Sequence, residues 1–91
     1  MNESTVLTES GMRIWLTERV AFHLERAPGQ IAPDVPLIRY GLDSVYAMSV
    51  NGDIEQEFGL ELDQTVLWDS PTIEALTRHI LDRLRAPSRI G

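Results

Sequence analysis

The chain has 91 residues and 43% hydrophobic content, which describes one small domain whose single modest core leaves no room for a deep catalytic cleft. It has no cysteine, which excludes a disulfide framework and a thiolate zinc site, and its two histidines do not by themselves make a metal site. The formal net charge of −6 argues against nucleic-acid binding, and the sequence has neither a membrane-spanning apolar run nor a signal peptide, so we expect a cytoplasmic protein that binds no nucleic acid and no membrane.

The first predicted element is an amphipathic helix over residues 10–27, which Pro28 and Gly29 end. Its apolar residues have the spacing that lines one face of a helix: Met12, Trp15, Leu16, Val20 and Leu24. We expect residues 1–9 before it and residues 86–91 at the other end of the chain to be disordered, so that the folded domain spans residues 10–85.

A long loop follows over residues 30–40, because Pro33, Asp34 and Pro36 forbid a regular helix there. Four apolar residues are expected to pack the loop against the core: Ile31, Val35, Leu37 and Ile38. An ordered loop of this length is unusual in so small a domain, and it indicates either a function or a fixed crossover between helices.

A second helix is predicted to begin at Asp43 and Ser44, because the Asp43 carboxylate can accept the free amide hydrogens of the first turn. Gly59 is expected to end this helix in a left-handed conformation. Gly52 in its middle costs about 1 kcal/mol of helix propensity relative to Ala. The residues assigned to the buried side are Val45, Met48, Ile54 and Phe58.

Two further elements complete the chain. A short connector or single-turn helix carries five apolar residues: Leu60, Leu62, Val66, Leu67 and Trp68. In the last helix, Ser70 is the predicted N-cap and Pro71 the first helical residue, with a core face made of Ile73, Leu76, Ile80, Leu81 and Leu84. The fold class is therefore all-α, with three longer helices, one short helix and a long loop between the first two helices.

The acidic residues are concentrated in the middle of the chain. All eight basic residues are Arg, none of which falls within residues 40–77, whereas eight of the fourteen acids do. This stretch carries a charge of −8, and the flanking segments, with eight Arg and six acids, carry +2. The asymmetry predicts either a face that attracts a basic partner or a solvated surface that maintains solubility.

Gly41, Leu42, Asp43 and Ser44 place one hydroxyl at an exposed helix N-terminus. The free amide hydrogens and the positive end of the helix dipole favour an anion at such a position. Ser44 is therefore well placed to carry a phosphodiester, although the same residue types are also the ordinary way to begin a helix.

Residues 40–47, which read Tyr-Gly-Leu-Asp-Ser-Val-Tyr-Ala, resemble the attachment motif of acyl carrier proteins. Residues 31–37, 58–62 and 68–73 resemble further segments of that family in the same order, so that the resemblance covers residues 12–84. It implies the four-helix carrier fold and a protein that is not an enzyme. It also implies a covalent 4'-phosphopantetheine on Ser44, held in an attachment site with Gly41, Leu42 and Asp43.

The resemblance implies that a phosphopantetheinyl transferase moves the arm from coenzyme A to Ser44. The monomeric carrier then presents acyl thioesters to a ketosynthase, an acyltransferase or an acyl-adenylating ligase. The segment from Leu42 to Ser44 and the segment from Trp68 to Thr72 resemble polyketide and fatty-acid carriers more than peptidyl carriers. A peptidyl or aryl carrier domain of a non-ribosomal peptide pathway stays open, as does an acidic helical interaction domain without a prosthetic group.

The resemblance also assigns a role to the acidic stretch. Asp53, Glu55 and Glu57 lie on the second helix, where carrier proteins meet basic surfaces of their partners. Val45 and Met48, if they are exposed rather than buried, add an apolar docking contact near the arm.

Overall fold

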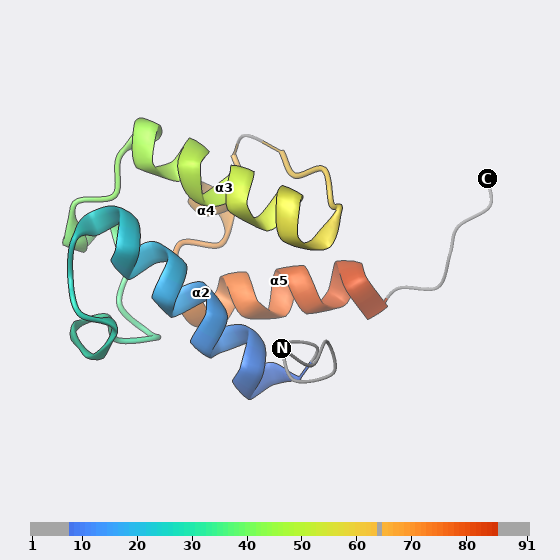
Figure 1. Ribbon diagram of the computed structural model, residues 1–91, viewed down its shortest axis with the longest axis horizontal. Helices are drawn as coiled ribbons and strands as arrows, with labels where there is room; N and C mark the ends of the chain where they lie inside the picture. The colour runs from blue at the N-terminus through green and yellow to red at the C-terminus, as the bar shows by residue number, and fades with distance from the viewer. Residues whose placement is uncertain (1–7, 64, 86–91) are drawn as a thin grey trace.

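The computed structural model describes residues 8–63 and 65–85, and the expectations for residues 1–7 and 86–91 lie outside this range. The described elements are α2 (Glu9–Leu24), η1 (Pro28–Gln30), η2 (Leu37–Tyr40), α3 (Ser44–Phe58), α4 (Val66–Asp69) and α5 (Ile73–Arg85). In Figure 1, α3 and α5 run in the same direction and α2 runs obliquely against them. The predicted all-α bundle of three longer helices and one short helix is confirmed.

The core lies between the three longer helices and also takes side chains from the loop and from α4. Its largest completely buried apolar side chains are Met12, Leu16, Val20, Leu37, Val50, Ile54, Leu67, Ile73, Leu76 and Ile80. Complete burial of one such side chain contributes about 1.5 to 3 kcal/mol, so the loop and α4 share in the stability of the domain. In the described part of the chain, every helix is too short or too polar to cross a membrane.

The N-terminal helix α2 ends at Leu24, three residues before the predicted end. Glu25 takes a left-handed conformation with φ of 57°, and the amide of Arg26 donates to the carbonyl of Ala21 at 2.9 Å. This arrangement closes a helix without glycine or proline, so the predicted end at Pro28 was too late. At its other end, α2 begins one residue earlier than predicted.

Two backbone hydrogen bonds anchor the long loop to the beginning of α5. The amide of Leu37 donates to the carbonyl of Pro71 at 2.8 Å, and the amide of Glu74 donates to the carbonyl of Pro33 at 2.9 Å. Since each bond satisfies polar backbone groups that would otherwise need another partner, the loop and α5 form one packed unit. This arrangement favours the fixed crossover that the sequence left as one of two readings.

The apolar loop residues divide between the core and the surface. Ile31 and Leu37 are buried, and Val35 is half-buried, as their assignment to the core predicts. Ile38 is 61% exposed, so its assignment to the core was wrong. The 3-10 turn η2 turns neighbouring side chains in different directions, and only Leu37 of its residues is buried.

The buried face of α3 differs from the predicted one. Ile54 is buried and Phe58 packs against the core, but Val45 and Met48 are 69% and 70% exposed, so their assignment to the core was wrong. The residues that α3 buries are Ala47, Val50, Asn51 and Ile54. These residues have helical spacing too, and they form a stripe that leaves Val45 and Met48 on the open side.

The beginning of α5 also differs from the prediction. Ser70 is not its N-cap, because the helix begins at Ile73, and the hydroxyl oxygen of Thr72 accepts the amide hydrogen of Ala75 at 3.0 Å. The carbonyl of Pro71 bonds to the loop instead, which holds this residue outside the helix. Thr72 therefore performs the capping role that the sequence assigned to Ser70.

Replacing Thr72 by Ala is expected to lower the free energy of unfolding by about 1 kcal/mol, because the amide of Ala75 loses its acceptor. The matched change Ser70→Ala should alter it by no more than a few tenths of a kcal/mol. Urea unfolding of both variants measures the difference. A larger loss for Ser70→Ala would contradict this assignment of the cap.

Candidate functional site

Ser44 is the first residue of α3, and its side chain is exposed. The Asp43 carboxylate accepts the amide hydrogen of Tyr46 at 3.0 Å, which confirms the predicted N-cap. The amides of Ser44 and Val45 have no partner within the helix, because the first turn of a helix lacks the preceding carbonyls. These amides and the positive end of the helix dipole make the position suitable for a phosphate ester on the Ser44 hydroxyl.

Gly41 and Leu42 determine where α3 begins. Gly41 has a φ of 97°, a conformation that favours glycine, and its amide donates to the carbonyl of Ile38 at 3.1 Å. The next side chain, Leu42, is buried in the core. A left-handed turn followed by a buried anchor fixes the chain so that Asp43 and Ser44 project to the surface, as the sequence predicts.

Tyr40 braces the loop that leads to this turn, a role that the sequence interpretation missed. Its phenolic oxygen accepts the amide hydrogen of Ala32 at 2.9 Å, and the guanidinium carbon of Arg26 lies 5.5 Å from the centre of its ring. Because the acceptor lies eight residues from its donor, no local sequence pattern indicates the bond. The contact holds the two ends of the loop together immediately before Ser44.

A hollow of about 250 Å³ lies beside Ser44, between α3 and α4. Its lining residues are Ser44, Ala47, Met48, Thr65 and Trp68. The predicted site did not include Thr65 and Trp68. The large aromatic Trp68 within the predicted short connector or single-turn helix was the signal that could have indicated them. The exposed Met48 and Trp68 side chains give this hollow apolar walls close to the Ser44 hydroxyl.

Asp53 lies between α2 and α3 rather than on an open acidic surface. Its carboxylate oxygen is 2.7 Å from Nε2 of His23 and 3.7 Å from Nη1 of Arg19, and its side chain is 27% exposed. The residue therefore joins two helices. A partner that engaged Asp53 would compete with His23 and Arg19.

Glu55 and Glu57 differ in a way that the sequence does not indicate. The Glu55 carboxylate accepts the amide hydrogen of Leu62 at 3.0 Å and so holds the segment that follows α3. Glu57 is exposed, and its carboxylate makes no hydrogen bond or ion pair with the residues that the structure describes. Of the three acids predicted for docking, only Glu57 is available without breaking a contact within the fold.

Comparison with known proteins places these features in a family. Residues 15–80 match the family described as "Phosphopantetheine attachment site", a span that includes Ser44. The acyl carrier protein LipD from Actinoplanes friuliensis is 42% identical, with a TM-score of 0.76 over 96% of this chain and 97% of that chain. A free-standing peptidyl carrier protein from an uncharacterized secondary metabolic pathway of Acinetobacter baumannii is 38% identical, with a TM-score of 0.84 over 87% of this chain and 99% of that chain.

The curated relatives are much longer proteins. The 5-methyl-1-naphthoate synthase of Streptomyces sahachiroi is 36% identical over 63 residues, which are 69% of this chain and 4% of that protein. The polyketide synthase PksL of Bacillus subtilis is 40% identical over 57 residues, which are 63% of this chain and 1% of that protein. The chain is therefore similar to one small portion of each of these synthases.

The different contacts of Glu55 and Glu57 predict different effects on stability. Glu55→Ala should lower the free energy of unfolding by about 1 kcal/mol, because the amide of Leu62 loses its acceptor. Glu57→Ala, which makes the same chemical change in the same helix, should stay within about 0.5 kcal/mol of the original protein. Urea unfolding tests both variants, and equal losses would show that the bond to Leu62 contributes nothing.

Proposed function

This chain belongs to the phosphopantetheine-attachment family of carrier proteins, and we propose that it carries acyl intermediates on a 4'-phosphopantetheine arm attached to Ser44. Members of this family are carriers rather than enzymes, so the domain presents its cargo and leaves the chemistry to its partners. The observation that carries the proposal is the exposed Ser44 hydroxyl at the capped N-terminus of α3, inside the matched residues.

The residues around Ser44 suit both the attachment and the charge that it brings. A phosphopantetheinyl transferase attaches the arm when Oγ of Ser44 bonds to the phosphorus, loses its proton, and displaces the nucleotide part of coenzyme A. The positive end of α3 and the free amides of its first turn then stabilise the phosphodiester charge. Once attached, the arm supplies a terminal thiol that holds an acyl group as a thioester.

The partners we propose are the transferase and the enzymes of a polyketide or fatty-acyl pathway, such as a ketosynthase or an acyltransferase. This choice is supported by the similarity to the polyketide synthase PksL of Bacillus subtilis. We also propose that the carrier is a monomer in the cytoplasm. A second candidate is a peptidyl carrier loaded by an adenylating ligase. The similarity to the free-standing peptidyl carrier protein of Acinetobacter baumannii favours it.

We propose further that partner enzymes contact Val45 and Met48. Both side chains are largely exposed on the first two turns of α3, next to Ser44, and Met48 also lines the hollow beside it. Exposed apolar side chains around a modified residue give a partner a surface that it can bury while it holds the arm. The acidic residues of α3 add long-range attraction for a basic partner, including those that also bind within the fold.

Incubation with a promiscuous phosphopantetheinyl transferase and coenzyme A tests the attachment. The mass of the protein should rise by one phosphopantetheinyl group, and Ser44→Ala should abolish the increase. Intact-protein mass spectrometry measures both. The proposed function is wrong if the original protein gains no mass, or if Ser44→Ala gains as much.

Once the protein carries the arm, the enzymes that load it distinguish an acyl carrier from a peptidyl or aryl carrier. We expect an acyltransferase to load an acyl group onto it faster than adenylating ligases load amino or aryl acids. The measurement is thioester formation with panels of both enzyme classes at equal concentration. Preferential loading by the adenylating ligases would favour the peptidyl or aryl carrier instead.

Docking at Val45 and Met48 predicts that Val45→Ala and Met48→Ala each lower kcat/KM of the transferase for this protein by about fivefold. Ile14→Ala is the matched control, since Ile14 is an exposed apolar residue on α2 outside this surface. All three changes should leave urea unfolding nearly unchanged, because the side chains are exposed. Equal rates for the three variants would exclude Val45 and Met48 as docking residues.

A further inference from the structure

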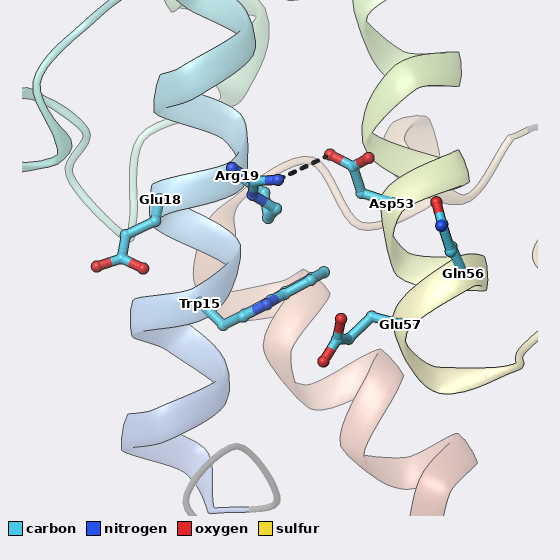
Figure 2. Close-up of a pocket in the computed structure, with 6 residues that line it drawn as sticks. All are labelled: Trp15, Glu18, Arg19, Asp53, Gln56 and Glu57. Carbon is cyan, nitrogen blue, oxygen red and sulfur yellow. Dashed lines mark ion pairs between the residues drawn. The ribbon is translucent and has the colours of Figure 1, made fainter. Parts of the chain in front are cut away.

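A groove of about 500 Å³ lies between α2 and α3, and Ser44 is not among its lining residues. The residues that line it are Trp15, Glu18, Arg19, Asp53, Gln56 and Glu57. In Figure 2 the Trp15 indole reaches from α2 toward α3, between the ion pair of Arg19 with Asp53 and the carboxylate of Glu57. Glu18 points away from α3 at the outer edge of the groove.

The charges at one end of the groove are already paired. Asp53 accepts from His23 at 2.7 Å and lies 3.7 Å from Arg19, so these three side chains join α2 to α3. The packing of α2 against α3 is therefore enough to explain why these three side chains lie together. It does not explain the other end of the groove.

Trp15 and Glu57 form the other end. The Trp15 ring packs edge-on against Phe58, with 5.0 Å between the ring centres and 68° between the planes, which fixes the orientation of the indole. The Glu57 carboxylate beside it is exposed, with no partner in residues 8–63 and 65–85. A fixed indole next to an unpaired carboxylate attracts a cation that has a flat face, because the ring and the charge act on it together.

We propose that this groove is a docking site for an arginine side chain of a partner protein. The guanidinium stacks against Trp15, pairs with Glu57, and donates to the side-chain carbonyl of Gln56. The surface already binds a guanidinium in a similar way, since Cζ of Arg19 lies 5.0 Å from the centre of the Phe22 ring one turn further along α2. Phe22 is 66% exposed and provides apolar area for the rest of a docking segment.

The charge and the geometry of the groove select this occupant over other cations and over anions. The net charge of −6 repels a phosphate backbone, and the described residues contain no group of three or more His, Asp or Glu placed to hold a metal ion. A lysine ammonium is a compact, strongly hydrated charge that pairs with Glu57 but does not stack as a plane on Trp15. The docking site rests on the attraction of basic partners proposed for α3 and adds a specific contact to it, and its test does not require the arm on Ser44.

The test is an NMR titration of the full chain with acetyl-Gly-Arg-Gly-amide, read at the indole Nε1–H signals, which Trp68→Phe assigns. The Trp15 signal should shift saturably and more than the Trp68 signal. The same peptide with citrulline in place of Arg keeps the shape but loses the charge, and it should bind about fivefold more weakly. Glu57→Gln should weaken binding of the arginine peptide by a similar factor.

Glu61→Gln is the matched control, because Glu61 is an exposed carboxylate that does not line the groove. It should leave the binding of the peptide unchanged. Trp15→Leu keeps an apolar side chain against Phe58 but removes the indole face together with its signal, so binding to this variant is read at the backbone amide signals of Gln56 and Glu57. It should weaken binding in a protein whose circular dichroism is unchanged. The proposal is overturned if Glu61→Gln weakens binding as much as Glu57→Gln, if citrulline binds as well as arginine, or if Trp15→Leu has no effect in a folded protein.

Discussion

The position of Ser44 depends on the loop between α2 and α3, which two backbone hydrogen bonds attach to the beginning of α5. With Leu37 bonded to Pro71 and Pro33 bonded to Glu74, a segment without regular helix becomes part of the packed structure. The buried Leu37 side chain adds the apolar contribution of a core residue at the same place. The chain therefore reaches α3 from a fixed point, and the exposure of Ser44 follows from the loop as much as from its own helix.

The acidic stretch of the chain is not one uniform surface. Asp53 joins α3 to α2, and Glu55 holds the segment after α3, so each of these carboxylates contributes to stability through a defined bond. Glu57 has no such bond in the described chain and remains open to a partner. A solvated acidic surface and a docking surface were alternatives at the level of the sequence. In the structure, single residues of one helix differ in role because the elements packed against them differ.

Sequence reasoning succeeded where the deciding interactions are local. The capping carboxylate of Asp43 and the left-handed Gly59 act within a few residues of their own positions, so residue type and spacing predict them. It failed where a distant segment takes part, as at the beginning of α5, where the carbonyl of Pro71 bonds to the loop and Thr72 is the cap. The buried face of α3 failed for a similar reason. Apolar spacing identifies a stripe, but only packing decides which of two stripes is covered, and Met48 belongs to the open one.

The hollow beside Ser44 and the groove beside Trp15 lie far enough apart on α3 to act separately. Ser44 and Asp53 are nine residues apart, which in an α-helix is about 13 Å along the axis and half a turn around it. The hollow beside Ser44 accordingly faces α4, whereas the groove with Trp15 faces α2. A side chain bound in the groove does not contact Ser44, because neither set of lining residues includes a member of the other. A carrier that must visit several enzymes benefits from this arrangement, since one contact can hold it near an assembly while the attachment site meets each enzyme in turn.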